Sequence, residues 1–393
     1  MRKIVLVFLI AIFIGAIVYV FTSNTNAEKG QKSFVLAMYY IKNNTLPNGK
    51  FIYRKHISSE FKYQNKKYNA LRHAGVLYSM YLCERYLNDS SLRKQRLIAS
   101  AYFVKNYVRC INNDQYAVIS KKEEGVKDDG TAKLGGSGLA LISLSNLYPE
   151  RLIEKKVLTG LAGFIVSMQR PDGNYAPKYL VHENMIDTLS LSLYYPGEAA
   201  MGLLYLNDVL PDMKWVLSAK KALLYLSQKR KELGINVEFD HWAMLATWKL
   251  FSIKENTLSN DERLLLEKHA EQMANSIIYQ QNMDSTDLYY GSLKGNIRPC
   301  SIGTKMEGLI AVYQIIDDKD LKIKVFKSLK AMNEFLEKAQ IREGDAIGGL
   351  PNSANWNTMN AKKNADIIQI DNVQHVLSAW ILYHKFITKD IKA

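Results

Sequence analysis

Four carboxylates stand at or near the starts of strongly apolar segments, namely Glu198, Asp240, Glu307 and Asp371. Hydrolysis of a glycosidic bond needs two carboxyl groups, one protonated as the acid and one ionised as base or nucleophile. The same residues also suit helix starts, since Asp caps a helix and Glu is favoured in its first turn. Their shared position predicts one cleft lined by all four, with catalysis and capping as alternative roles.

Asp240 is the first choice for a catalytic acid because His241 and Trp242 follow it directly. An aromatic ring beside a carboxyl group can raise the pKa of that group, which is what a proton donor requires near neutral pH. We therefore expect Asp240 to act on a ligand, with His241 and Trp242 among the residues that bind it.

Glu307 is the second choice, since Arg298 and Lys305 precede it and would suit an anionic substituent. Epimerase or lyase chemistry needs a His or Tyr base, and a uronate carboxylate needs an arginine. Arg72, His73 and His375 supply these types, although a lone helix histidine is commonly structural. Aromatic residues that could stack on a sugar, or equally pack in the core, are Tyr194, Tyr195, Tyr289, Tyr290 and Trp356.

The sequence contains no HExxH or CxxC motif, and its three cysteines, Cys83, Cys110 and Cys300, are odd in number and irregularly spaced. Such a set implies no disulfide framework. The glycines of the segment 135–138 lack the GK[ST] ending of a phosphate loop. We therefore expect no metal, no cofactor and no disulfide.

The elements that position these residues form a repeat in which a polar loop runs into an apolar helix. In Ile297–Ile316, Thr304 and Glu307 fit a capping box, which predicts a helix start at Thr304. Apolar segments of this kind recur at steps of about 44 to 68 residues, with an amphipathic helix between each pair. The apolar helices are expected at 69–86, 134–147, 196–209, 240–251, 304–316 and 371–384.

Twelve alternating helices predict an all-α (α/α)6 toroid, a ring of six helical hairpins. Helices that are apolar all round belong inside, and amphipathic helices belong outside. Every inner helix would begin at the same end of the ring, where the long loops also gather. Segments 50–66 and 115–129 alternate apolar and polar residues and are expected to form loops or short β-hairpins.

The chain resembles the six-hairpin toroids of bacterial carbohydrate-active proteins over about residues 30–390. The segments that carry this resemblance are Arg72–Gly75, Tyr194–Ala199, Asp240–Trp242, Thr304–Gly308 and Asp371–His375. In layout it is similar to glycoside hydrolases, unsaturated-uronide hydrolases and uronate epimerases, and also to terpenoid cyclases and prenyltransferase β-subunits. The absence of a DxDD motif and of an Asp/Cys/His zinc set counts against a hopene-type cyclase and a prenyltransferase.

Residues 1–29 are expected to be an N-terminal membrane anchor or signal segment, and residues 30–393 the toroid domain. Arg2 and Lys3 precede an unbroken apolar run, Ile4–Phe21, which is long for a signal peptide and just sufficient to span a bilayer. Either interpretation places the toroid outside the cytoplasm, periplasmic or extracellular. An exported protein of net charge +14 without a recognised nucleic-acid motif is not expected to bind nucleic acid.

The sequence therefore predicts a membrane-associated or exported protein that acts on an envelope or extracellular poly- or oligosaccharide. A glycoside hydrolase is the leading interpretation. The alternatives are a uronate epimerase or lyase, a non-catalytic glycan-binding or assembly protein, and a terpenoid-cyclase-like toroid with an apolar cavity.

Overall fold

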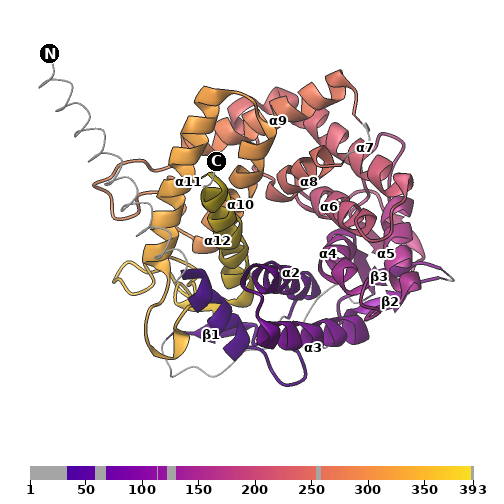
Figure 1. The fold of residues 1–393 in the computed structure, drawn as a ribbon, viewed down its shortest axis with the longest axis horizontal. Coiled ribbons are helices and arrows are strands. Elements are labelled where there is room, and N and C mark those ends of the chain that lie inside the picture. Colours follow the sequence, from indigo (N-terminus) through magenta and orange to yellow (C-terminus); the bar gives the residue numbers. More distant parts are fainter. Residues whose placement is uncertain (1–32, 58–67, 113, 122–129, 254–257, 391–393) are drawn as a thin grey trace, which may run out of the picture.

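The computed structural model describes residues 33–57, 68–112, 114–121, 130–253 and 258–390, and these form a closed ring of helices (Figure 1). Each inner helix contacts the next one along the chain, and the last contacts the first. The inner helices are α2 (Ala70–Leu87), α4 (Leu134–Leu144), α6 (Tyr195–Asn207), α8 (His241–Phe251), α10 (Pro299–Ile315) and α12 (Ile370–Asp390). The structure confirms the mostly helical (α/α)6 toroid.

The outer wall consists of the amphipathic helices, which alternate with the inner ones along the chain. They are α3 (Ser90–Tyr107), α5 (Lys155–Ser167), α7 (Met213–Arg230), α9 (Asn260–Gln280), α11 (Lys319–Ala339) and the helical residues 33–43. Gln95 of α3 donates a hydrogen bond to the carbonyl of Lys42, and Gln340 donates one to the carbonyl of Ser33. The helix at 33–43 therefore connects the two ends of the outer wall.

The inner helices pack closely enough that small residues are required between them. All eleven residues of α4 are buried, and a Cβ atom on Gly138 would lie 2.4 Å from the carbonyl oxygen of Glu198 in α6. A Cβ atom on Gly202 would lie 2.5 Å from the carbonyl oxygen of Gly138. The small residues at 135–138 thus serve close helix packing.

The predicted start of α10 is wrong. Helix α10 begins at Pro299, with Arg298 as N-cap, so Thr304 and Glu307 do not form a capping box. Proline is favoured in the first turn of a helix because a backbone N–H at that position would have no acceptor within the helix. The preference of Pro299 for the first turn therefore outweighs the capping-box pattern of Thr304 and Glu307. Helix α12 begins at Ile370, one residue before Asp371, so this acid is not its N-cap.

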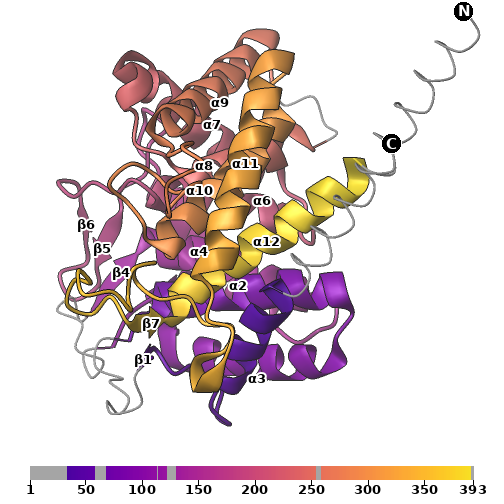
Figure 2. The same ribbon diagram turned by 90° about the vertical axis from the view of Figure 1, so that its left-hand side faces the viewer.

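The seven short strands of the described residues lie at the end of the ring where the inner helices begin, and Figure 2 shows five of them there, β1 and β4 to β7. Strands β2 (Val108–Cys110) and β3 (Tyr116–Val118) pair as a local hairpin. Three strands, β4 (Thr131–Lys133), β5 (Lys178–Leu180) and β6 (Met185–Asp187), form an antiparallel sheet.

The predicted β-hairpin within 50–66 differs from the observed pairing. Strand β1 (Arg54–His56) pairs with β7 (Ile367–Gln369), near the other end of the chain, and residues 58–67 lie outside the described ranges. This antiparallel pairing joins the segments that lead into the first and the last inner helix.

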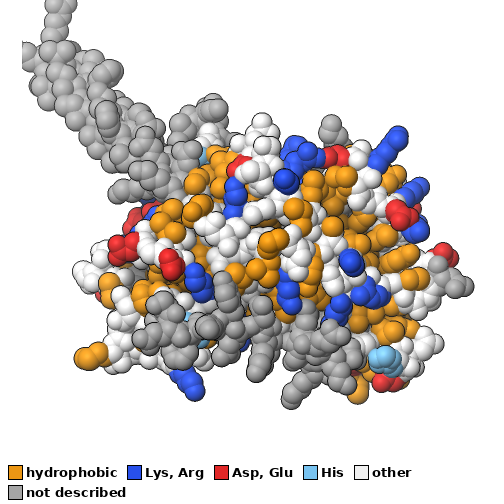
Figure 3. All heavy atoms as spheres, turned by 90° about the horizontal axis from the view of Figure 1, so that it is seen from below, with side chains coloured by type: hydrophobic (Ala, Val, Ile, Leu, Met, Phe, Trp, Pro, Cys, Tyr) orange, Lys and Arg blue, Asp and Glu red, His pale blue; other side chains and the backbone are white. Residues whose placement is uncertain are grey.

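None of the helices within the described residues is long and apolar enough to cross a membrane. The anchor or signal segment expected at residues 1–29 lies outside the described residues. On the face seen in Figure 3, lysine and arginine side chains are spread among hydrophobic ones and do not gather in a single patch. The positive charge of the described outer wall is therefore dispersed on this side.

Candidate active site

Three inner helices bring His241, Glu307 and His375 together near the end of the ring where those helices begin. His241 is the first residue of α8, whereas His375 and Glu307 lie further along α12 and α10. Oε2 of Glu307 is 3.1 Å from Nδ1 of His375 and 4.0 Å from Nε2 of His241. The two imidazole rings lie edge to face, with centroids 5.4 Å apart. Two bases and a carboxylate thus share one site.

Both carboxylate oxygens of Glu307 have partners on α12. The hydroxyl of Ser378 donates to Oε1, and Oε2 accepts from the imidazole of His375 if that proton is on Nδ1. Ser378 lies three residues after His375, so both side chains project from the same face of the helix. The fully buried Glu307 therefore fixes the ring of His375 and leaves its Nε2 available to a ligand.

His241 is almost entirely buried among rings and lacks a conventional hydrogen bond. Its ring lies 5.3 Å from that of Tyr194 and 5.0 Å from that of Trp242, centroid to centroid. Neither ring nitrogen has a hydrogen-bond partner among the described residues. Burial, with smaller contributions from His375 and Lys305, holds the pKa of His241 well below its ordinary value. Burial therefore favours the neutral imidazole of His241 over the imidazolium.

An aromatic layer closes the centre of the ring beneath these groups. The ring of Tyr78 in α2 lies 5.8 Å from that of Trp242 in α8 and 6.3 Å from that of Tyr205 in α6, measured between centroids. Tyr78 and Trp242 are each at most 2% exposed. Trp242, expected to bind the ligand, thus belongs to the floor of the site.

A polar rim stands beside the histidines, built from the first and last inner helices. Nε of Arg72 lies 2.9 Å from Oδ2 of Asp371, and Nη1 of Arg72 donates to the hydroxyl of Tyr53. The Arg72 side chain remains 38% exposed. The other oxygen of Asp371, Oδ1, is buried and has no hydrogen-bond partner among the described residues. The rim therefore presents an exposed cation next to a free acceptor.

Asp240 is placed differently from the other acids. Its Oδ1 accepts from the backbone N–H of Ala243, which makes it the N-cap of α8, and its Oδ2 lies 2.9 Å from Nη2 of Arg230 in α7. Burial raises its pKa, and Arg230 and the cap hydrogen bond oppose that effect. Asp240 is fully buried, and both of its oxygens have structural partners.

Glu198 is a buried carboxyl at the contact between α4 and α6. Its Oε2 has no hydrogen-bond partner among the described residues, and a Cβ atom added to Gly135 would lie 1.8 Å from it. Burial, helped by the nearby negative charge of Asp240, raises the pKa of Glu198 to about 8. This acid is therefore protonated at neutral pH, and the half-buried ring of Tyr195 packs against the same glycine.

His73 faces away from the centre. It is 1% exposed, its Nδ1 is 2.7 Å from the hydroxyl of Tyr68, and its Nε2 is 3.0 Å from the carbonyl of Ala99 in α3. Burial lowers its pKa to about 3. His73 therefore joins an inner helix to an outer one, which is the structural alternative noted from the sequence.

The remaining predicted ligand-binding residues lie elsewhere on the inner helices or further out. Arg298 is exposed at the start of α10, and Lys305 is half-buried, with burial lowering its pKa. Trp356 lines a separate hollow of about 550 Å³, together with Ile57 and Tyr289. Trp356 is thus not brought to the histidine cluster.

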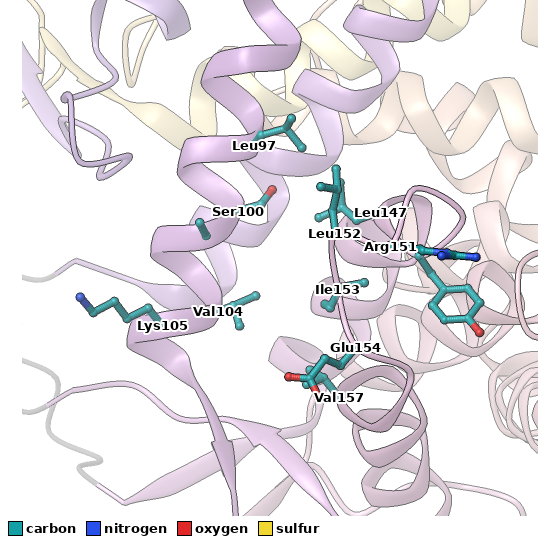
Figure 4. Close-up of a pocket in the computed structure, with 12 residues that line it drawn as sticks. Leu97, Ser100, Val104, Lys105, Leu147, Arg151, Leu152, Ile153, Glu154 and Val157 are labelled. Carbon is teal, nitrogen blue, oxygen red and sulfur yellow. The ribbon is translucent and has the colours of Figure 1, made fainter.

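A further hollow of about 720 Å³ lies on the outer wall between α3 and the segment leading into α5 (Figure 4). Apolar side chains dominate it, among them Leu97, Val104 and Ile153, with Lys105 and Glu154 at its edge. None of the predicted site residues lines it, and it belongs to the outer helices.

Sequence reasoning found the two histidines and Glu307 separately but did not group them. It missed Ser378, Tyr53 and Tyr78 altogether. The spacing of His375 and Ser378, three residues apart on one helix, was the available signal. Among the described residues, His241, Glu307 and His375 are also the set that could bring three metal-binding atoms within 4.8 Å of one another.

Comparisons with protein-family models and with curated proteins give no match. Solved structures match over nearly the whole chain at low identity. A sugar epimerase from a ruminal bacterium has a TM-score of 0.66 at 14% identity, covering 90% of this chain and 98% of its own. An α-1,6-mannanase of Salegentibacter, in complex with α-1,6-mannotriose, has a TM-score of 0.60 at 13% identity, covering 92% and 99%.

An unsaturated glucuronyl hydrolase specific for heparin has a TM-score of 0.60 at 12% identity, covering 92% of this chain and 98% of its own. Likeness at such identity concerns the fold, because one fold carries many activities. The chain is accordingly a six-hairpin (α/α)6 toroid like those of sugar epimerases, mannanases and unsaturated glucuronyl hydrolases.

Proposed function

We propose that this protein is a carbohydrate-active enzyme that removes a proton from a sugar carbon and returns one, as an epimerase or isomerase does. The observation that carries the proposal is the pair of imidazoles, His241 and His375, with ring centroids 5.4 Å apart at the end of the ring where the inner helices begin. Histidine is the side chain best suited to exchange protons near neutral pH.

The proposed reaction uses the two rings in turn. One neutral imidazole takes the proton from the carbon next to the sugar carbonyl, and the electron pair moves to give an enediolate. The other, as imidazolium, returns a proton to that carbon or its neighbour, so the net charge is unchanged. Burial favours the neutral form of His241, and neither of its ring nitrogens has a hydrogen-bond partner among the described residues, which leaves them available for the base role. Glu307 lies 3.1 Å from Nδ1 of His375 and fixes the orientation of that ring, so that its Nε2 can face the sugar in the acid role.

The polar rim would bind the sugar. Arg72 offers an exposed guanidinium toward a hydroxyl or carbonyl oxygen, and Oδ1 of Asp371 is a free acceptor for a hydroxyl group. The ion pair between Arg72 and Asp371 holds both groups in place before the sugar arrives, which lowers the entropic cost of binding.

Hydrolysis of a glycosidic bond stays a prediction with less support. Asp240, Glu307 and Asp371 each have a basic partner within 3.1 Å, namely Arg230, His375 and Arg72. Each of these carboxyl groups is held by that partner, so none of them is free to face the oxygen of a leaving group. Glu198, the protonated carboxyl, packs against α4.

The place of action is part of the proposal. The apolar N-terminal segment supports export or anchoring, and the substrate is then a sugar at the end of an envelope or extracellular oligosaccharide. The sugar epimerase and the mannanase that share the fold support a carbohydrate ligand.

The test is solvent exchange. The protein is incubated in D2O with mannose, cellobiose or a uronate-terminated disaccharide, and the products are followed by NMR. Epimerisation or isomerisation incorporates deuterium at the reacting carbon, whereas hydrolysis releases new reducing ends without C–H exchange. Release of reducing ends without exchange would refute the proposal in favour of hydrolysis, and tight binding without reaction would favour a glycan-binding protein.

His375→Gln and His241→Gln should each abolish exchange while the protein still melts cooperatively. His182→Gln is the matched control, because His182 is an exposed histidine between β5 and β6. Exchange that persists in both site variants would show that the imidazoles are not the acid and base.

A further inference from the structure

We propose that His241, Glu307 and His375 form a binding site for a divalent transition-metal ion, such as zinc. One ligand atom from each of these residues lies within 4.8 Å of the other two. The three side chains come from three different inner helices, α8, α10 and α12, so the site depends on the closed ring.

The separations suit a shared ion. Zinc binds imidazole nitrogen and carboxylate oxygen at roughly 2.0–2.2 Å, so two ligand atoms around a tetrahedral ion are about 3.3–3.6 Å apart. Oε2 of Glu307 lies 3.1 Å from Nδ1 of His375 and 4.0 Å from Nε2 of His241. These two values lie on either side of the ideal one, and the third separation, between the nitrogens of His241 and His375, is within 4.8 Å, so side-chain rotation would have to draw the three atoms together around the ion.

A second observation points to a ligand at the same place. His241 is 3% exposed, yet neither of its ring nitrogens has a hydrogen-bond partner among the described residues. A buried polar atom without a partner is unfavourable, commonly by about 1–3 kcal/mol. An ion between the three side chains would give one nitrogen of His241 a partner.

The donor set indicates which ions bind. Two imidazoles and one carboxylate suit zinc, cobalt, nickel and copper, whereas magnesium and calcium prefer sites built from oxygen atoms. Three protein ligands leave at least one coordination position for water or another small ligand. The side chain of His375 is 18% exposed, so the ion can enter from solvent.

The consequence for activity rests on the proposed function, whereas the binding itself does not. A bound ion would take Nδ1 of His375 and Nε2 of His241 and would replace the hydrogen bond between Glu307 and His375 on which the proposed proton transfer depends. Zinc should therefore inhibit the exchange reaction, and a chelator should restore it. The cluster would then respond to the metal supply outside the cytoplasm.

The experiment measures metal binding without any sugar. The full-length protein is stripped with a chelator and titrated with ZnCl2 by calorimetry, and CoCl2 is added separately to record the absorption of bound cobalt. We expect one ion per chain, a cobalt spectrum of a site with nitrogen and oxygen ligands, and no binding of MgCl2.

Glu307→Gln keeps the shape of the side chain and should weaken zinc binding at least about tenfold, as should His241→Ala and His375→Ala. The matched control is His56→Ala, which removes a histidine 2.9 Å from Asp366 on the outer surface of the site end. Melting curves show whether each variant is folded.

The proposal is overturned if the wild type binds no zinc, or if the folded Glu307→Gln and histidine variants bind as tightly as the wild type. Loss of binding in His56→Ala instead would assign the ion to the surface pair and also overturn it. Because these readouts need no turnover, a failure of the proposed proton transfer leaves them unaffected.

Discussion

Replacing Glu198 by glutamine should make the protein more stable at alkaline pH. Burial raises the pKa of this carboxyl to about 8, against an ordinary value of 4.5. Below pH 4.5 both the folded and the unfolded protein carry the proton. Between pH 4.5 and 8 the unfolded chain loses it while the folded protein keeps it, so folding becomes less favourable as the pH rises.

The size of the effect follows from the difference between the two pKa values. A shift from 4.5 to about 8 is about 3.5 pH units, and each unit corresponds to about 1.4 kcal/mol, giving at most about 5 kcal/mol above pH 8. Glutamine keeps the shape of the side chain and cannot ionise. The free energy of unfolding of Glu198→Gln, minus that of the wild type, should therefore increase steadily from pH 5 to pH 8.

The measurement is urea unfolding followed by circular dichroism at several pH values between 5 and 9. Glu183→Gln is the control, since Glu183 is exposed and its replacement should leave the difference from wild type constant with pH. Parallel curves for Glu198→Gln and the wild type would refute the reasoning, because they would mean that Glu198 is ionised in the folded protein at neutral pH. An infrared difference spectrum offers an independent check, through the loss of a protonated carboxyl band.

Three further changes test other parts of the structure. Asp240→Asn keeps the cap but removes the charge paired with the buried Arg230, so the free energy of unfolding measured in urea should fall by about 3–5 kcal/mol. Turnover per folded molecule should not change, and a stable variant that has lost turnover would show that Asp240 is catalytic after all. Gly138→Ala forces α4 from α6 and should lower the melting temperature by several degrees. Gly163→Ala in α5, where the nearest atom lies 4.0 Å from the added Cβ, should leave it almost unchanged. A reductant should leave the melting temperature unchanged because Cys83, Cys110 and Cys300 are free, and a fall of several degrees would contradict this.

The architecture could be predicted from the sequence because its signal is repeated. A helix such as α4, buried on every side, and one such as α11, with lysines facing outward, differ plainly in composition. The predicted start of α10 is five residues too late, because the T-x-x-E pattern was interpreted as a capping box and the preference of Pro299 for the first turn of a helix was overlooked. The pairing of β1 with β7 could not be predicted, because nothing local selects a partner so far along the chain.

The sequence pointed to the residues of the candidate site, but it did not predict how they are arranged. His241, Glu307 and His375 were all candidates, but the sequence attached Glu307 to a helix start, and the structure places it more than two turns into α10. The preference for Asp240 failed to anticipate Arg230, which lies at the end of a different helix. Residues that meet across the ring lie far apart in the sequence, so no regular spacing predicts their contact. Contacts between neighbours along one helix, by contrast, follow from their spacing.

The antiparallel pairing of β1 and β7 makes the order of assembly matter. Arg54 donates to Gln369 across 315 residues of chain, and α12 completes the ring against α2. Contacts of such sequence separation form late, after much chain entropy has been lost. His375 lies on that last helix, so a chain still emerging from the ribosome carries an open arc of hairpins without the cluster. The cluster itself can therefore form only once the ring has closed.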